Sequence, residues 1–236
     1  MAKKNFVVKM FDDIAPTYDK LNHLLSLNVD KSWRKKAVKR IMQHQPKRLL
    51  DIACGTGDFA IALAQAGVPE VMGVDISEGM LEVGRKKVAE LGLNIEMKVD
   101  DSESLSMADD SLDAISVAFG VRNFEHLQVG LGEMCRVLRP GGMLCVLELS
   151  VPSNPILLWG YKLYFLHVLP FFGGLISGNR EAYSYLPASV LNFPKPDAFC
   201  QMLRTAGFEQ VEAKAFTFGL CRMFIGIKPS AETTKA

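Results

Sequence analysis

Two short segments hold the residues whose types and spacing suit ligand binding. The first, residues 48–58 (RLLDIACGTGD), runs from an apolar stretch into a loop with Gly55 and Gly57 and then into a helix. The second, residues 71–75 (VMGVD), ends in the carboxylate of Asp75, about twenty residues after the first glycine. Glycines allow a tight turn and a close approach of the backbone to a ligand, and an acid at this spacing can accept hydrogen bonds from both ribose hydroxyls. The pattern predicts a ligand that contains adenosine.

The charges around this loop decide which adenosine cofactor fits. Residues 55–60 (GTGDFA) match the relaxed dinucleotide pattern G-x-G-x-x-A, but a pyrophosphate there would be repelled by the flanking carboxylates of Asp51 and Asp58. S-adenosylmethionine instead carries an ammonium and a sulfonium beside its ribose, and a carboxylate attracts both. The two acids also have structural interpretations, as a loop cap for Asp51 and a helix N-cap for Asp58. We expect S-adenosylmethionine to be bound by Asp51, Gly55, Thr56, Gly57 and Asp75.

Composition sets broad limits on the class of protein. A chain of 236 residues is long enough to bury most of its unfolded surface in one domain. The 27 basic and 26 acidic residues nearly cancel, so no overall field favours nucleic acid. The five cysteines form no C-x-x-C pair, which indicates a reducing compartment, and the N-terminal segment has no secretory apolar region. We expect a single domain over residues 1–236 in the cytoplasm.

Short apolar runs alternate with helical segments along most of the chain, which is typical of βαβ units around a parallel sheet. We expect strands at 48–53, 70–75, 95–100, 112–118 and 143–149, and helices at 58–66, 78–91 and 125–138. After Pro196 a further helix should end at Gly207, followed by a closing pair of edge strands at 208–212 and 220–228. The predicted fold class is α/β with a mostly parallel sheet.

Polar groups also follow the third predicted strand. Asp100, Asp101 and Ser102 come where this strand ends, and such groups can reach adenine edges at the carboxyl side of the sheet. Further on, residues 138–143 (LRPGGM) end a predicted helix and lead into a strand. Proline and paired glycines suit a turn at that point, and structure alone would explain them.

Taken together, the glycine loop, the acid after the second strand, the Asp-Ser pair and the L-R-P-G-G turn resemble class I S-adenosylmethionine-dependent methyltransferases. Residues 18–33 and 136–150 resemble the two signatures of the UbiE/MenG quinone-biosynthesis methyltransferases. The segments 119–124 (FGVRNF) and 182–187 (AYSYLP) are also similar to that family, and the likeness extends over roughly residues 6–228.

Three positions depart from the family pattern. Leu21 and Asp30 stand where the first signature usually carries Met and His, and Ala118 stands where some relatives have Ser near the cofactor. Because position 30 is an aspartate, a catalytic role for a histidine there does not carry over.

The resemblance implies a Rossmann-like fold with a mostly parallel seven-stranded sheet, helices on both faces and a last antiparallel strand. It also implies methylation of a ring carbon on a prenylated quinol, most simply the conversion of demethylmenaquinol to menaquinol. The alternatives are the 2-methoxy-6-polyprenyl-1,4-benzoquinol step of ubiquinone biosynthesis, methylation of another small molecule, and a non-catalytic nucleotide-binding module. Asp101, Ser102 and Ala118 complete the expected cofactor site.

The chemistry of such a quinol indicates which side chains would be catalytic. A phenolic hydroxyl has a pKa of about 10, so the ring carbon becomes a good nucleophile only when that hydroxyl loses or strongly shares its proton. Arg122 follows the fourth strand, where a guanidinium can stabilise the phenolate, and Asn123 can orient the same oxygen or a water. Tyr18 and Asp19 are further candidates. The structural alternatives are a salt bridge for Arg122, packing for Tyr18 and a helix N-cap for Asp19.

Two segments are expected to cover the substrate: an N-terminal helical lid at residues 1–45 and a cap at residues 151–195. Residues 156–176 are rich in apolar and aromatic side chains, but Lys, His, Pro and Gly interrupt them, which disfavours a spanning helix. A buried packing helix and a lipid-lined tunnel for an isoprenoid tail both fit. The cluster that suggests a tunnel consists of Trp159, Tyr161, Leu163, Tyr164, Phe165, Leu166, Phe171 and Phe172.

A substrate with an isoprenoid tail resides in the bilayer, so we expect peripheral contact with the inner face of the cytoplasmic membrane. The basic run at residues 31–40 contains Trp33 and suits either a solvated helix face or anionic headgroups. The sequence leaves a homodimer open.

Overall fold

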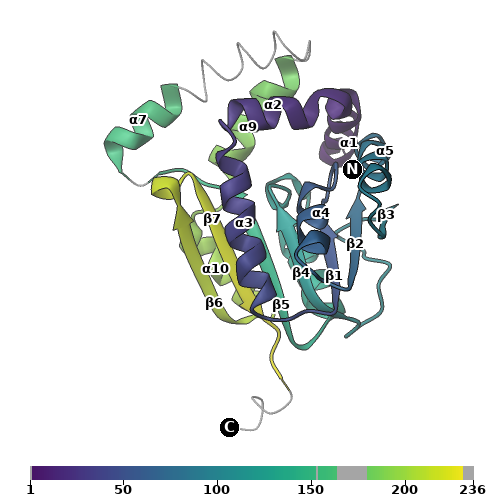
Figure 1. The fold of residues 1–236 in the computed structure, drawn as a ribbon. Helices are drawn as coiled ribbons and strands as arrows, with labels where there is room; N and C mark the ends of the chain where they lie inside the picture. The colour runs from purple at the N-terminus through teal and green to yellow at the C-terminus, as the bar shows by residue number, and fades with distance from the viewer. Residues whose placement is uncertain (1, 153, 164–179, 231–236) are drawn as a thin grey trace.

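The computed structural model describes residues 2–152, 154–163 and 180–230. The strands of this described part form one seven-stranded sheet in the order β3-β2-β1-β4-β5-β7-β6, which can be followed in Figure 1. The strands are β1 (Arg48–Ile52), β2 (Glu70–Asp75), β3 (Ile95–Val99), β4 (Leu112–Ala118), β5 (Leu138–Leu149), β6 (Glu209–Phe216) and β7 (Cys221–Ile227). Strands β1 to β5 are parallel, and β7 runs antiparallel to both of its neighbours, β5 and β6. The predicted fold class is confirmed.

Helices surround this sheet. They are α1 (Ala2–Ile14), α2 (Tyr18–Leu25), α3 (Val29–Met42), α4 (Asp58–Gln65), α5 (Glu78–Glu90), α6 (Leu127–Val137), α7 (Pro155–Leu163), α9 (Arg180–Asn192) and α10 (Pro196–Thr205). The described residues also form the short 3₁₀ helices η1 (Ala15–Thr17), η2 (Val121–Asn123) and η4 (Thr217–Gly219). Local chemistry explains two of the starts: the Ser77 side chain accepts a hydrogen bond from the Met80 N–H at α5, and Pro196 occupies the first turn of α10.

The sheet is covered on both faces, which is why its parallel strands are apolar along their length. On one face Ile41 of α3, Leu63 of α4 and Leu81 of α5 belong to a single buried cluster. On the other face Leu131 of α6 and Phe199 of α10 belong to a second cluster. The two clusters pack against the strands from both faces of the sheet.

The N-terminal helices lie at the carboxyl end of the parallel strands, together with α7 and α9 (Figure 1). Asp12 of α1 is tied to the start of α5, because its Oδ1 accepts hydrogen bonds from Ser77 Oγ at 2.6 Å and from the Gly79 N–H at 2.9 Å. Residues 164–179 of the expected cap, which include Phe165 and Phe171, lie outside the described residues. In the described part of the chain no helix is both long and apolar enough to cross a membrane.

One local prediction is wrong. Residues 138–142 do not form a turn before the fifth strand, because β5 already begins at Leu138, which pairs with Leu112. The register then shifts, so that Ala114 pairs with Met143, and residues 139–142 are accommodated as a bulge. Gly141 takes the left-handed conformation there (φ +78°), and its N–H donates to the Lys228 carbonyl at 2.9 Å. Strand β6 is also longer than expected.

Candidate active site

Two adjoining cavities open at the carboxyl ends of the parallel strands. The larger encloses about 590 Å³ and the smaller about 70 Å³. They share six lining residues: Phe11, Tyr18, Ala53, Gly55, Ala118 and Phe119. The smaller cavity is also lined by Asp75, Asp101 and Ser102, whereas Thr56 and Asp51 line the larger one. Seven of the eight residues predicted to bind a cofactor therefore line these cavities, and the eighth, Gly57, lines neither.

The glycine loop has the conformation that its sequence predicts. Gly55 and Gly57 have φ of +55° and +81°, a region that side chains disfavour. The Gly55 N–H donates to Asp75 Oδ2 at 2.8 Å, and the Ser77 N–H donates to Asp75 Oδ1 at 2.9 Å. Burial raises the pKa of Asp75. Gly57, and not Asp58, occupies the N-cap position of α4, so the N-cap interpretation of Asp58 is wrong.

The backbone is strained where the two cavities meet. Ala53 and Phe119, which follow β1 and β4, have φ of +51° and +59° although neither is glycine. A Cβ on Gly120 would lie 2.5 Å from the Ala53 Cβ, so only glycine fits beside it. Such strain persists where surrounding packing enforces it, and it is common at ligand sites. Ala118, the last residue of β4, lines both cavities.

Asp51 supplies the observation that tests the predicted cofactor. The residue is buried, with 1% of its surface exposed, and Oδ1 accepts a hydrogen bond from Ser116 Oγ at 2.6 Å. Oδ2 has no hydrogen-bond partner among the described residues. Burial raises the pKa of Asp51 to about 7. An unpaired carboxylate oxygen on the cavity wall fits the ammonium of S-adenosylmethionine, because a cation there would stabilise the charged form.

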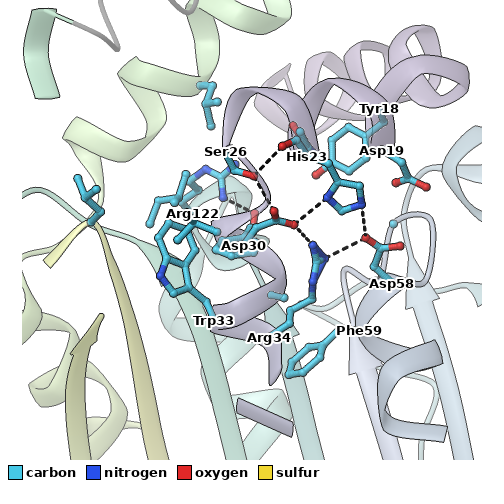
Figure 2. A pocket seen from close by; sticks show the side chains of 18 of the residues that line it. Tyr18, Asp19, His23, Ser26, Asp30, Trp33, Arg34, Asp58, Phe59 and Arg122 are labelled. Atoms are coloured by element: carbon cyan, nitrogen blue, oxygen red, sulfur yellow. Dashed lines mark hydrogen bonds and ion pairs between the residues drawn. The ribbon is translucent and has the colours of Figure 1, made fainter. Parts of the chain in front are cut away.

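A network of charged side chains forms the polar end of the larger cavity (Figure 2). Asp30 accepts hydrogen bonds from Ser26 Oγ at 2.5 Å and from Arg34 Nη2, and its Oδ2 lies 2.9 Å from His23 Nδ1. Asp58 Oδ2 lies 3.3 Å from His23 Nε2 and accepts from Arg34 Nη1 at 3.0 Å. Burial alone would raise the pKa values of Asp30 and Asp58, but their partners hold both below the ordinary range.

The same network extends to the glycine loop through Asp19. Thr56 Oγ1 donates to Asp19 Oδ1 at 2.5 Å, and Lys87 Nζ donates to Asp19 Oδ2 and Asp58 Oδ1, each at 2.6 Å. Asp19 is the second residue of α2, so its predicted alternative as an N-cap is wrong. Its neighbour Tyr18 lines both cavities, and burial raises the pKa of its phenol.

Arg122 and Asn123 face different parts of the site. Arg122 lines the larger cavity, and its Nη1 lies 2.7 Å from Glu148 Oε1, while its Nε donates to Ser189 Oγ at 3.2 Å. The salt bridge considered as an alternative for Arg122 is therefore present, and it is almost fully buried. Asn123 lines the smaller cavity, where its Oδ1 accepts from Tyr185 Oη at 3.2 Å.

The N-terminal helix also reaches the smaller cavity. Lys4 Nζ contacts Asp101 Oδ2, and Lys3 Nζ donates to the Phe124 carbonyl at 2.7 Å. Burial would raise the pKa of Asp101, but the hydrogen bond from Lys4 keeps it low. Helix α1 therefore occupies one face of the predicted adenosine site.

The rest of the larger cavity is mainly apolar and opens at a rim of exposed side chains. Its walls include Met10, Phe11, Ile14, Trp33, Phe59, Tyr161, Leu186 and Leu220. Among the described side chains the three most exposed large apolar ones are Leu27 and Phe218, at 80% each, and Trp159, at 70%. Leu27 and Phe218 line this cavity, and Trp159 precedes the lining residue Gly160.

The pairing of His23 with Asp30 was missed in the sequence. The two residues lie in α2 and α3, on either side of a turn at Leu27 and Asn28, both with positive φ. Their spacing of seven residues carries no pattern of its own, because the turn and not a helical repeat brings them together. A histidine is thus present beside position 30, although it comes from the preceding helix.

Known proteins similar to this chain include named methyltransferases. A family model described as the ubiE/COQ5 methyltransferase family matches residues 1–228. The chain is 45% identical over 229 residues to the demethylmenaquinone methyltransferase of Bacteroides fragilis, covering 96% of this chain and 94% of the relative. It is 46% identical over 227 residues to the protein of that name in Deinococcus radiodurans, with the same coverage. It is 44% identical to the ubiquinone/menaquinone biosynthesis C-methyltransferase UbiE of Geobacter sulfurreducens, covering 93% and 87%.

Solved structures share the fold at lower identity. The cyclase SpnF aligns with a TM-score of 0.70 at 18% identity, covering 95% of this chain and 96% of that one. A SAM-dependent methyltransferase of Thermotoga maritima aligns with a TM-score of 0.66 at 21% identity, covering 94% and 99%. These likenesses concern the fold alone. The family model spans residues 1–228, and relatives with 44–46% identity cover nearly the whole chain, so this chain belongs to the ubiE/COQ5 methyltransferase family.

Proposed function

We propose that this methyltransferase transfers a methyl group from S-adenosylmethionine to a ring carbon of demethylmenaquinol and so produces menaquinol. The names of the Bacteroides and Deinococcus relatives support the choice of acceptor. The observation that carries the proposal is the pair of joined cavities, in which a polar site beside the glycine loop opens into a mainly apolar chamber of about 590 Å³. A chamber of that kind suits a lipid-soluble ring compound.

The cofactor would be held by residues at the carboxyl ends of four strands, β1 to β4. Asp75 would accept the ribose hydroxyls, Asp101 and Ser102 would meet the adenine edge, and Asp51 would pair with the ammonium. Gly55, Thr56, Gly57 and Ala118 would surround the rest of the molecule. When bound, S-adenosylmethionine supplies an electrophilic methyl group on a sulfonium.

The chain's own residues would activate the acceptor. Arg122 would stabilise the phenolate as its negative charge develops, and its ion pair with Glu148 would keep the guanidinium in place. Asn123 would orient the phenolic oxygen or a bridging water. Tyr18 and Asp19 would shape the ring site from α2, and the hydrogen bond from Thr56 to Asp19 supports a link between that helix and the cofactor loop.

The lid at residues 1–45 and the cap at residues 151–195 would receive the substrate at a membrane surface. The exposed rim of Leu27, Trp159 and Phe218 supports this, because apolar side chains around a cavity mouth can enter the headgroup region and let a lipid pass without crossing water.

Vesicle flotation of the double variant Leu27→Ser, Phe218→Ser tests the membrane proposal. The vesicles contain anionic lipid, and the matched control is Leu91→Ser, which removes a half-exposed leucine outside both cavities. The double variant should float much less than the wild type, and the control should float equally well. Equal flotation of all three proteins would reject the rim as a membrane contact.

The substrate test uses purified protein, labelled S-adenosylmethionine and one of two acceptors: demethylmenaquinol, or the benzoquinol precursor of ubiquinone. The name of the Geobacter relative includes both ubiquinone and menaquinone biosynthesis. Demethylmenaquinol should give the higher kcat/KM and a ring-methylated product by mass spectrometry. A higher kcat/KM for the benzoquinol would assign the protein to the ubiquinone step, and no methylation of either would reject the proposal.

A further inference from the structure

We propose that His23 is the base that removes the ring proton during methyl transfer, with Asp30 as the residue that positions its imidazole. This inference rests on the proposed function, because it names the proton acceptor of that same reaction. His23 lines the larger cavity and is partly accessible, with 22% of its side chain exposed. It is therefore placed to meet a substrate in the cavity.

The geometry around His23 fits a histidine that gains a proton. Asp30 Oδ2 lies 2.9 Å from Nδ1, and Asp30 is itself fixed by Ser26 and Arg34 (Figure 2). With the Nδ1 proton donated to Asp30, Nε2 carries the lone pair that accepts a proton. Asp58 Oδ2 lies 3.3 Å from Nε2, so an imidazolium would have a carboxylate beside each nitrogen. The site is thus complementary to the protonated form, which stabilises a transition state in which His23 accepts a proton.

The charges of the surrounding elements support the same role. Two carboxylates flank His23, Asp30 of α3 and Asp58 of α4, and a third, Asp19 of α2, is linked to Asp58 through Lys87. Two cations, Arg34 of α3 and Lys87 of α5, pair with them. The network therefore carries one unbalanced negative charge while His23 is neutral, and an imidazolium cancels it.

Other titratable groups on the cavity wall leave this balance unchanged. Tyr18 of α2 keeps its phenol proton because burial raises its pKa, and the charge of Arg122 is matched by Glu148. The remaining lining carboxyl is Asp51 of β1, which we assign to the cofactor's ammonium.

The reaction balances with His23 as the acceptor. The quinol reacts as the phenolate that Arg122 stabilises, after its hydroxyl proton has passed to solvent. The ring carbon forms a bond to the methyl carbon, and the electron pair of the carbon–sulfur bond moves to sulfur, which changes from a sulfonium to a neutral thioether. The proton on the methylated ring carbon then passes to His23 Nε2, and the electrons of the carbon–hydrogen bond restore the aromatic ring. One positive charge disappears at sulfur and one appears at His23, so the buried site holds the same total charge before and after.

The test compares His23→Asn with His126→Asn in the full-length protein. His126 is a matched control because it is an exposed histidine paired with Glu103, and it lines neither cavity. His23→Asn should lower kcat for demethylmenaquinol by about 10²–10⁴-fold, while S-adenosylhomocysteine affinity, measured by calorimetry, changes little. His126→Asn should behave like the wild type.

Two further measurements separate proton transfer from a structural role. Added imidazole should restore part of the rate of His23→Ala, because it can occupy the space of the lost ring. Asp30→Asn should move the acidic limb of the kcat profile to lower pH, because the imidazolium loses its stabilising carboxylate.

An unchanged kcat in His23→Asn would overturn the proposal, as would a parallel loss of S-adenosylhomocysteine binding or a His23→Ala variant that binds this ligand but is not rescued. A wild-type protein that methylates neither quinol would instead overturn the proposed function and this inference with it.

Discussion

Removing the charge of Asp51 should stabilise the ligand-free protein, and increasingly so at high pH. The pKa of this buried carboxyl is raised from its ordinary value of 3.8 to about 7. Between these values the folded chain binds a proton that the unfolded chain has lost. The protonated carboxyl therefore contributes fully to the free energy of unfolding below the pKa of the unfolded chain. This contribution is lost as the pH rises through the pKa of the folded chain, by about 1.4 kcal/mol per pH unit. Between the two pKa values of 3.8 and about 7, the total loss in the free energy of unfolding is about 4 kcal/mol.

The assay is urea unfolding of the wild type and Asp51→Asn without cofactor. The free energy of unfolding of Asp51→Asn, relative to the wild type, should rise by about 3 kcal/mol between about pH 5 and about pH 8. Burial also raises the pKa of Asp75, which is present in both proteins, and its charge repels that of Asp51 and so contributes to the same trend. The control is Asp13→Asn, which changes an exposed aspartate of α1. Its free energy of unfolding, relative to the wild type, should not rise with pH.

A difference that stays constant with pH would refute the reasoning, because it would mean that Asp51 ionises alike in the folded and unfolded chains. The same substitution should weaken S-adenosylhomocysteine binding by about 1.5–3 kcal/mol at high pH, since a charged partner of the ammonium is lost. Calorimetry near pH 6 in buffers of different ionisation enthalpy should also detect proton release when the wild type binds this ligand. Unchanged affinity would remove Asp51 from the cofactor site.

Three other substitutions have defined outcomes. Asp75→Ala should weaken S-adenosylhomocysteine binding at least about tenfold in calorimetry, through the lost ribose contacts, and an unchanged affinity would exclude that role. Arg122→Ala leaves the Glu148 carboxylate buried without its cation and should lower the free energy of unfolding by about 3–5 kcal/mol, besides reducing kcat; full stability would show that the ion pair contributes nothing. Gly120→Ala forces a Cβ against Ala53 and should cost about 1–3 kcal/mol in urea unfolding, so a neutral result would mean that the loop shifts easily.

The sheet could be predicted from the sequence because each strand is recognisable from a short segment of the chain. Each parallel strand is a short apolar run bounded by polar or glycine residues, and the spacing from Gly55 to Asp75 reflects one βαβ unit, in which the Gly55 N–H donates to Asp75. The bulge at residues 139–142 was missed because proline and glycine favour a turn locally, whereas pairing with β4 and β7 determines the outcome.

The polar end of the cavity was less predictable, because its residues come from four helices. Asp19 and Asp58 each have an ordinary local explanation as helix caps, and only the packing of α2 and α3 against α4 and α5 brings Lys87 between them. His23 had no local signal at all. The burial of Arg122 against Glu148 likewise depends on the distance between η2 and the end of β5, which the sequence does not encode in any short segment.

If Asp101 meets the adenine edge, as proposed, its contact with Lys4 makes helix α1 a competitor for the cofactor. An adenine at Asp101 would displace that ammonium, so only the fraction of molecules with Lys4 released would be competent to bind, and the apparent affinity would fall by that fraction. The reduction applies equally to the methyl donor and to the demethylated product, because both carry the same adenine. Tethered competition of this kind would slow the binding of both forms of the cofactor without changing their relative affinity.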